Sequence, residues 1–257
     1  MPTRSNRPSA RWSCILMFDR TMDKRTFKDT VYQQFARIGG AVASPKRLEI
    51  LDLLCQGEKS VDALAEQAAL TIGNTSAHLK ALKTARLVET RREGQFIFYR
   101  VADPAVCEFW LALRALGEKR LAEVRDVARE YFTDRDQLSP LDKRQLLARA
   151  RKGEVILLDV RPEDEYRAGH LPFARSVPAD ELERKLSTLP KGRDIVAYCR
   201  GPYCVWAYEA VSLLRRKGYR ATRFEDGVAE WRSAGLPIEQ EGLGPAEKTS
   251  TGSTRGK

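Results

Sequence analysis

Apolar positions in the first part of the chain recur every three or four residues, the spacing of an amphipathic helix. A first helix is predicted from the stripe Val31, Phe35, Ile38 and Val42. A second is predicted in "SPKRLEILDLLCQ", where Ser44 is a favourable N-cap, Pro45 suits the first turn and Gly57 follows the end. Two shorter helices are predicted next, "VDALAEQAAL" after Ser60 and "IGNTSAHLKALKTAR" after Thr71.

A hairpin and a long helix are predicted after these four helices. The text "LVETRREGQFIFYRV" alternates β-branched and aromatic residues with polar ones, and Glu93, Gly94 and Gln95 supply a turn. Residues 104–131 are then predicted to form one continuous helix. Its apolar stripe consists of Phe109, Leu113, Leu116, Leu121 and Val124.

The second half of the chain has a different pattern. "VILLDVR" and "DIVAYC" are short apolar runs typical of buried strands, and "DKRQLLARARKGE" is a polar helix. Strands that alternate with helices indicate a parallel α/β sheet. The fold class predicted is therefore multidomain, a mainly α unit followed by an α/β unit, with a boundary at Ser139 and Pro140. Residues 1–27 are expected to be a flexible extension and residues 241–257 a disordered tail.

Composition adds charge and compartment to this picture. The 257 residues include 45 Lys and Arg against 35 Asp and Glu, and the net charge of +10 favours a polyanionic partner, nucleic acid first. Five irregularly spaced cysteines are typical of reduced cytosolic thiols. No run approaches the ~20 apolar residues of a membrane span, and "CILMF" is too short for a signal-peptide core. We expect a cytoplasmic protein that does not contact a membrane.

The predicted order of elements in the first half is that of a winged helix-turn-helix. Its segments "SPKRLEILDLL" and "KSVDALAEQAALTIGNTSAHLKALKTARLVETRREGQFIFYRV" resemble the ArsR/SmtB family of bacterial repressors over residues 28–115. The resemblance implies a transcriptional regulator that binds a double-stranded DNA operator. It also implies a homodimer formed through the first and last helices, with residues 116–139 as helix end and linker. The alternative for the apolar stripe of the last helix is that it packs on the α/β unit.

A helix-turn-helix inserts its second helix into the major groove, where base edges can be recognised. Short polar side chains near the start of that helix suit contact with bases, and basic side chains there and on the wing suit phosphates. The candidate DNA-binding residues are Asn74, Thr75, Ser76, His78, Lys80, Lys83, Arg91 and Arg92. Thr75 is among them although it shares with Leu79 and Leu82 the face that should pack inward. The alternative for each basic residue is an ordinary solvated surface.

Many ArsR/SmtB repressors sense metals, and this sequence departs from both usual sites. Ser60 and Asp62 stand where the thiolate site has cysteines, and the last helix contains no histidine. The chain has only His78 and His170, so we predict neither a metal nor another cofactor.

Two cysteines of the first unit form a candidate thiol sensor. Some ArsR-like repressors sense persulfides through one cysteine in the second helix and one in the last, and here Cys55 and Cys107 have those positions. The alternative is that each is a small core residue.

The second unit resembles the rhodanese domain over residues 140–240, through "LLDVRPEDEYRAGHLPFARSVP", "VAYCRGPYC" and "FEDGVAEWRSAGLPIE". A parallel strand that ends in a tight loop before a helix directs backbone N–H groups at one spot, which stabilises an anion or a thiolate. The resemblance implies that Cys199 is catalytic and carries sulfane sulfur as a persulfide, taken from a donor such as thiosulfate or a persulfide. Its loop is Arg200, Gly201, Pro202, Tyr203, Cys204 and Val205.

Three features of this loop modify the expectation. Val205 stands where related phosphatases have the arginine that closes the loop, which disfavours phosphate-ester chemistry. Pro202 lacks a backbone donor. Cys204 is predicted to attack a Cys199 persulfide, release the sulfur and leave a disulfide, the alternative being an inert small residue. Arg200 could guide thiosulfate towards Cys199.

Other motif residues of the second unit are expected to be structural. Asp159, Arg161, Glu165 and His170 are expected to tie loops beneath the active site, and Trp231 to lie in the core. His170 is not predicted to be a general base.

Three hypotheses follow for the whole chain. The first is a DNA-binding transcriptional regulator, expected to be a repressor, that senses or relays sulfane sulfur or another thiol-reactive signal through Cys199. The second is a sulfurtransferase enzyme that the DNA-binding unit localises or regulates. The third is a regulator whose rhodanese-like unit is a catalytically idle interaction domain.

Overall fold

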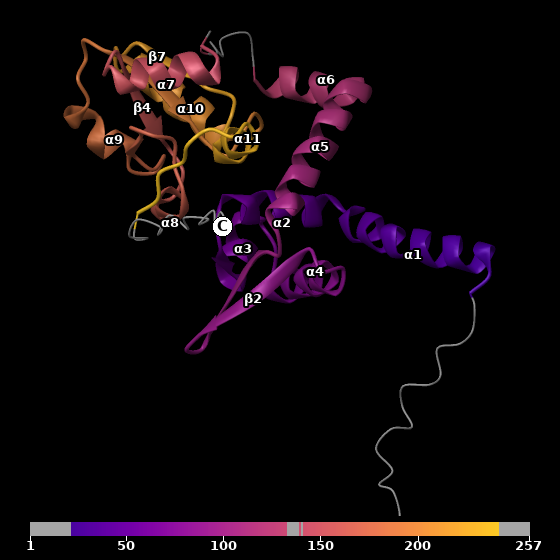
Figure 1. The fold of residues 1–257 in the computed structure, drawn as a ribbon. Helices are drawn as coiled ribbons and strands as arrows, with labels where there is room; N and C mark the ends of the chain where they lie inside the picture. The colour runs from indigo at the N-terminus through magenta and orange to yellow at the C-terminus, as the bar shows by residue number, and fades with distance from the viewer. Residues whose placement is uncertain (1–21, 133–138, 140, 242–257) are drawn as a thin grey trace, which may run out of the picture.

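The computed structural model describes residues 22–132, 139 and 141–241, which form an N-terminal helical unit and a C-terminal α/β unit (Figure 1). Most of the predicted extension and tail lies outside these residues, but residues 24–27, counted in the flexible extension, form the start of α1, so that part of the prediction is wrong. In the described part of the chain, no helix is both long and apolar enough to span a bilayer.

The N-terminal unit is a helical core with a three-stranded antiparallel sheet. Its elements are α1 (Lys24–Val42), α2 (Pro45–Gln56), β1 (Lys59–Ser60), α3 (Val61–Gln67), α4 (Ile72–Thr84), β2 (Val88–Glu93), β3 (Phe96–Val101), α5 (Pro104–Arg120) and α6 (Ala122–Tyr131). Local sequence explains the helix starts, because Ser60 and Thr71 accept backbone hydrogen bonds from the third residue beyond them. Leu51, Leu64 and Leu79 are fully buried where α2, α3 and α4 meet.

The wing is the hairpin of β2 and β3, which turns at Gly94 with a positive φ of 58°. Strand order is β1-β3-β2, so β3 is the central strand and the short strand β1 pairs with the edge of β3 opposite β2. Both strands lie where the sequence predicted them.

The long last helix was predicted wrongly as one piece. It ends as α5 at Arg120, and Leu121 adopts an extended conformation (φ −108°, ψ 105°) before α6 begins (Figure 1). The Leu121 N–H still bonds to the Gly117 carbonyl at 2.8 Å. Because Leu121 is neither proline nor glycine, helical periodicity continues through the break and gives no signal of it.

The C-terminal unit is a parallel four-stranded sheet in the order β5-β4-β6-β7. Its elements are α7 (Lys143–Arg151), β4 (Val155–Asp159), α8 (Glu163–Ala168), β5 (Arg175–Ser176), α9 (Leu182–Lys185), η1 (Leu186–Thr188), β6 (Asp194–Tyr198), α10 (Val205–Arg216), β7 (Ala221–Arg223) and α11 (Val228–Ser233). One face of the sheet packs on α9 and α10, the other on α7 and α11. Trp231 is fully buried in the second of these cores, as predicted.

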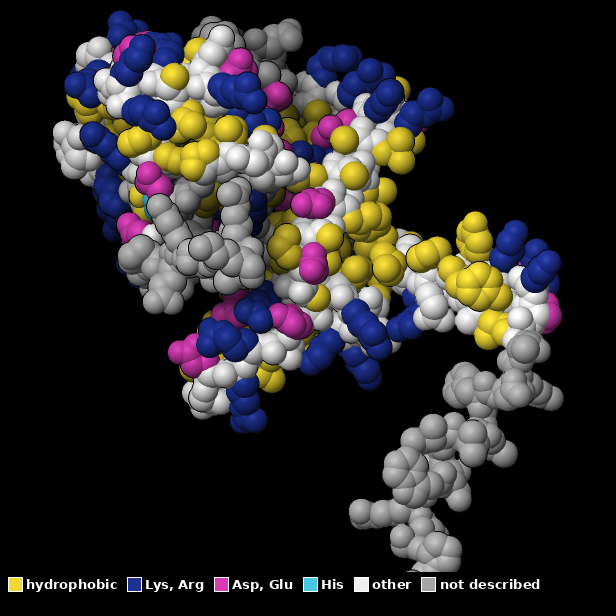
Figure 2. Space-filling view, in the orientation of Figure 1, with side chains coloured by type: hydrophobic (Ala, Val, Ile, Leu, Met, Phe, Trp, Pro, Cys, Tyr) yellow, Lys and Arg dark blue, Asp and Glu magenta, His cyan; other side chains and the backbone are white. Residues whose placement is uncertain are grey.

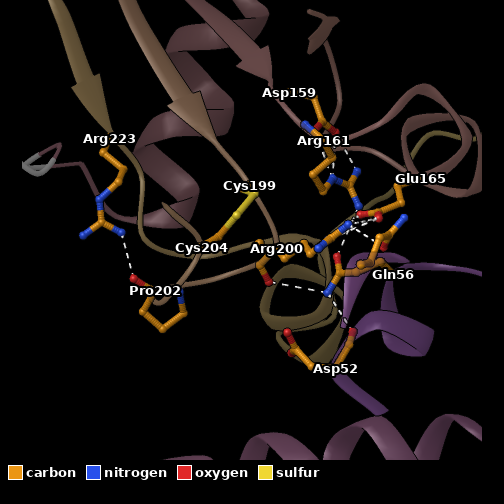
Figure 3. Close-up of a disulfide and its surroundings, with 12 residues drawn as sticks. Asp52, Gln56, Asp159, Arg161, Glu165, Cys199, Arg200, Pro202, Cys204 and Arg223 are labelled. Atoms are coloured by element: carbon orange, nitrogen blue, oxygen red, sulfur yellow. Dashed lines mark hydrogen bonds and ion pairs between the residues drawn. A yellow bond between two sulfur atoms is a disulfide. The ribbon is translucent and has the colours of Figure 1, made fainter. Parts of the chain in front are cut away.

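The two units touch along α2 and α5 of the first and α11 of the second. The loop that follows β6 and begins with Cys199 lies beside α2, where Gln56 contacts Arg200 (Figure 3). The candidate site is at this junction.

Candidate functional site

Cys199 directly follows β6 and is only 1% exposed. Cys204 is the N-cap residue of α10, and its sulfur is joined to that of Cys199 by a disulfide (Figure 3). Both sulfurs therefore lie at the N-terminal end of a twelve-residue helix. The partial positive charge of that end stabilises a thiolate. The described geometry thus matches the predicted place of a reactive cysteine, and its predicted catalytic role stays a prediction.

The loop between the two cysteines is held by backbone contacts. Cys204 N–H bonds to the Gly201 carbonyl at 3.2 Å, and Arg223 donates to the Pro202 carbonyl at 3.1 Å. Gly227 lies against the same loop, and a Cβ there would stand 2.5 Å from the Arg200 carbonyl carbon and oxygen. Only glycine fits this close approach of two backbones.

The Arg200 side chain is held by three partners. Its guanidinium lies 2.5 Å from a Glu165 carboxylate oxygen, 2.8 Å from the side-chain oxygen of Gln67, and 4.5 Å from the centre of the Trp206 ring. These partners hold the guanidinium in place, and the expectation that Arg200 guides thiosulfate stays a prediction.

A buried ion pair ties the strand β4 to the loops around the site. Arg161 and Asp159 are fully buried and 2.6 Å apart, and Arg161 also donates to the Gly169 carbonyl at 2.7 Å. His170 bonds through Nδ1 to the Tyr166 carbonyl at 2.8 Å and stacks on the Tyr166 ring. These are structural contacts, in line with the expectation for this group.

The same network continues into the helical unit. Lys59 of β1 is fully buried, 2.9 Å from Glu165 and 3.1 Å from Asp164. Burial raises the pKa of Glu165, but its hydrogen bond and charge interaction with Arg200, and the charge of Lys59, outweigh burial and lower that pKa. Glu165 is therefore an ionised bridge between the wing sheet and the cysteine loop.

Gln56, the last residue of α2, makes a second bridge. Its side-chain oxygen accepts from Arg161 at 3.2 Å, and its side-chain nitrogen lies 3.5 Å from the Arg200 carbonyl (Figure 3). Sequence reasoning missed Gln56, Lys59 and Gln67, because each meets a partner more than 100 residues away and belongs to no motif.

A cavity of about 370 Å³ lies between the two units, and we call it the interdomain chamber. Its walls are Glu49, Asp52, Leu53 and Gln67, Trp110 and Arg114 of α5, and residues 200–206. Trp110 donates to Asp52 at 2.8 Å, and Arg114 pairs with Glu230 at 2.7 Å. Burial raises the pKa of Asp52 to about 6 despite the Trp110 hydrogen bond.

A second disulfide joins Cys55 of α2 to Cys107 in the first turn of α5. Cys55 is one helical turn from Asp52, and Cys107 one turn from Trp110, so disulfide and chamber share the α2–α5 contact. The expectation of reduced thiols differs from this structure, in which four cysteines are paired. Cys14 lies outside the described residues.

Most candidate DNA-binding residues of α4 are exposed. Asn74, Ser76, Lys80 and Lys83 are exposed, and His78 is half-buried. Thr75 is fully buried, and its hydroxyl donates to the Thr71 carbonyl at 3.0 Å. Its inclusion among the DNA-binding residues is wrong, because helical periodicity turns this side chain into the core.

The two wing arginines differ. Arg91 is 2.6 Å from Glu58 and 2.7 Å from Glu93, so its charge is already matched. Arg92 is exposed and donates to the Gly94 carbonyl at 3.1 Å. Figure 2 shows Lys and Arg side chains along the lower edge of the helical unit and hydrophobic side chains over α5 and α1.

Comparisons with known proteins divide the chain at the same place. Residues 44–90 match the profile described as bacterial regulatory protein, arsR family, and residues 142–234 match the profile described as rhodanese-like domain. An HTH-type transcriptional regulator of Mycobacterium tuberculosis, Rv0324, is 43% identical over 213 residues, or 83% of this chain and 93% of that protein.

Each unit also has a separate relative. A sulfurtransferase of Allochromatium vinosum is 35% identical over 86 residues, 33% of this chain and 78% of that protein. The solution structure of a homodimeric winged helix-turn-helix DNA-binding domain from Mycobacterium bovis is 38% identical. It covers 40% of this chain and 93% of that one, with a TM-score of 0.37.

Proposed function

The chain belongs to the ArsR family of bacterial transcriptional regulators and carries a C-terminal rhodanese-like domain, and from this premise we propose that it is a repressor whose operator affinity follows the sulfur state of Cys199. The observation that carries the proposal is the position of the cysteine loop. Arg200, beside Cys199, reaches Lys59 of the wing sheet through Glu165 and touches Gln56 at the end of α2. A chemical change at Cys199 therefore acts directly beside the DNA-binding unit.

The proposed operator contacts are the exposed polar residues of α4 and the wing. Asn74 and Ser76 near the helix start are small enough for close approach to base edges. Lys80, Lys83 and Arg92 are proposed to meet phosphates. Arg91 contributes less, because Glu58 and Glu93 already neutralise it.

A homodimer is proposed from the apolar surface of the helical unit. Tyr32 and Phe35 of α1 are 69% and 64% exposed, and Leu116 of α5 is 57% exposed. Exposed apolar side chains such as these are typical of a protein interface. Two copies related by a twofold axis would match two operator half-sites.

The proposed chemistry begins with a Cys199 thiolate. It attacks the outer sulfur of thiosulfate, the sulfur–sulfur bond of the donor breaks, and sulfite leaves with the electron pair. The Cys204 thiolate then attacks Cys199 Sγ in the persulfide and expels hydrosulfide, which leaves the Cys199–Cys204 disulfide. The bond between the two sulfurs in the structure supports this step, because it requires that they come within bonding distance.

The Cys55–Cys107 pair is proposed as a second sensing element in the same protein. Its disulfide fixes α5 to α2, and α2 packs on α4, the helix proposed to enter the groove. Opening this bond would free the start of α5 without touching the operator contacts.

The test compares operator binding by the reduced protein before and after exposure to thiosulfate, with intact mass recorded in parallel. The operator is a duplex selected for binding from a random pool. We expect one added sulfur, or loss of two hydrogens after disulfide closure, together with at least a tenfold loss of affinity. Cys199→Ser should show neither change, whereas Cys107→Ser should keep the mass change. Loading of Cys199 with unchanged DNA binding would contradict the proposal.

A second candidate function is sulfurtransfer as an enzyme, favoured by the likeness of the C-terminal unit to a protein named a sulfurtransferase. Repeated turnover of thiosulfate with cyanide, unaffected by operator DNA, would favour it. Cys204 argues against sustained turnover, since closure of the disulfide stops the cycle.

A further inference from the structure

We propose that the interdomain chamber is a binding site for a low-molecular-weight thiol, which reduces the Cys199–Cys204 disulfide by attacking Cys204. The chamber admits such a thiol and keeps protein reductants away from the bond. This inference rests on the proposed function in one respect only. It assumes that the Cys199–Cys204 disulfide, once formed, must be reduced again.

The two sulfurs differ in access. Cys199 is 1% exposed and does not line the chamber, whereas Cys204 is half-buried and forms part of its wall. Thiol–disulfide exchange needs the attacking thiolate in line with the sulfur–sulfur bond, and access decides which sulfur is attacked. A thiol in the chamber therefore meets Cys204.

The leaving group is compatible with this direction. Cys199 lies at the strand end beside the N-terminus of α10, where a thiolate is stabilised. A thiol of lowered pKa leaves faster. Attack on Cys204 thus expels Cys199 as a thiolate at the same helix end.

The chemistry balances with two thiols. The first thiolate forms a bond to Cys204 Sγ, the Cys204–Cys199 bond breaks, and Cys199 leaves as thiolate. A second thiolate attacks the sulfur of the bound thiol, forms the external disulfide, and Cys204 leaves as thiolate. Two molecules of thiol are oxidised and one protein disulfide is reduced.

Size and walls define the class of reductant. The volume of about 370 Å³ is at the lower end of ordinary small-ligand pockets, and it holds an amino-acid-sized thiol. Helices α2 and α5 lie beside the loop, because Leu53 and Trp110 line the same chamber as Cys204. Arg114 is also close, since a Cβ on Gly201 would lie 3.3 Å from its guanidinium.

The rim is closed on one side as well. The Tyr203 hydroxyl donates to Glu118 of α5 at 2.9 Å, which links the cysteine loop to the helical unit. A dithiol reductase must place its own loop over the target disulfide, and these helices occupy that space.

The experiment uses the full oxidised chain without DNA. L-cysteine, or thioredoxin with its reductase and NADPH, is added with insulin as a reference disulfide. Freed thiols are alkylated at intervals, and peptide mapping separates the Cys199–Cys204 pair from Cys55–Cys107. We expect cysteine to reduce the pair through an adduct on Cys204, with Cys199 alkylated first. Thioredoxin should raise the rate of reduction of the Cys199–Cys204 disulfide less than twofold, under conditions in which it reduces insulin.

Two matched variants test the chamber itself. Glu49→Trp narrows it at an exposed position of α2 and should slow reduction by cysteine at least threefold. Glu130→Trp, exposed on α6 outside the chamber, should leave the rate unchanged.

The inference is overturned by an adduct on Cys199, by equal rates for both variants, or by thioredoxin reducing the pair as readily as insulin. Because the readout is sulfur chemistry without DNA, these outcomes do not depend on whether Cys199 controls operator affinity. Failure of the proposed function is visible only in the operator assay.

Discussion

Replacing Asp52 by asparagine should make the protein more stable at pH 8. The carboxyl lies on the wall of the interdomain chamber, and burial raises its pKa from the ordinary 3.8 to about 6. Asparagine keeps a side-chain oxygen that can accept the Trp110 hydrogen bond, now 2.8 Å long, but it carries no charge. The substitution therefore removes the cost of burying an ionised group.

The pKa difference gives the size and the pH window. At 1.36 kcal/mol for each pKa unit, the step from 3.8 to about 6 corresponds to a ceiling of about 3 kcal/mol. The fold binds this proton more tightly than the unfolded chain does, so the contribution of Asp52 to stability is most favourable below pH 4. It falls as pH rises through 6, and the cost is complete above that. Solvent in the chamber screens the charge, so we expect a gain of about 1–2 kcal/mol at pH 8.

Urea unfolding at several pH values measures this gain. It appears as a shift of the urea midpoint, with the dependence of the unfolding free energy on urea concentration unchanged. The advantage of Asp52→Asn over the parent should shrink towards zero at pH 4. Glu49→Gln, one turn earlier in α2 and exposed beside Lys46, should change stability by less than about 1 kcal/mol at any pH. An Asp52→Asn protein that is less stable than the parent at pH 8 would refute the reasoning. It would mean that Arg114 and Arg200 stabilise the charge by more than burial costs.

Three further predictions concern other parts of the junction and the DNA-binding surface. Gly227→Ala should destabilise the fold by about 1–3 kcal/mol and slow sulfur loading of Cys199, read by intact mass, because the new methyl meets the Arg200 backbone. Gly192→Ala, with open space around it, is the control. Lys80→Ala should lower the slope of operator affinity against salt concentration by the equivalent of about one phosphate contact per protomer. Arg91→Ala should lower this slope by less, because Arg91 is already ion-paired. Lys59→Met should cost about 3 kcal/mol in urea unfolding, since it removes one partner of a buried pair; a cost below 1 kcal/mol would show that Arg200 alone satisfies the carboxylate.

Sequence predicted the two kinds of fold, the wing and the strand that ends at Cys199, because hydrophobic periodicity and capping residues act within a few positions. The assignment of the two halves to the ArsR and rhodanese families is confirmed by the comparisons. The break at Leu121 could not be predicted, since no residue there disfavours a helix. The inward turn of Thr75 was predicted by periodicity, although the residue was also counted as a DNA contact.

The junction between the units was beyond sequence reasoning. Lys59 looks like one more surface lysine in a basic chain, yet it is fully buried against Glu165. Gln56 ends a helix without any motif and still bonds to Arg161, 105 positions away. Such contacts depend on how the two folded units pack against each other. The local sequence pattern of either unit does not predict that packing.

Helix α2 contacts both the candidate DNA-binding helix and the junction. Its buried leucines pack in one core with Leu79 of α4, the helix that carries the candidate base contacts. Its other side carries Asp52, Cys55 and Gln56, which meet the chamber, the second disulfide and the cysteine loop respectively. A shift of α2 would therefore disturb both its packing on α4 and its contact with the cysteine loop. If the proposed function holds, sulfur loading of Cys199 and operator binding are coupled through this helix, and reciprocity then requires that operator DNA change the equilibrium constant of sulfur loading by the same factor.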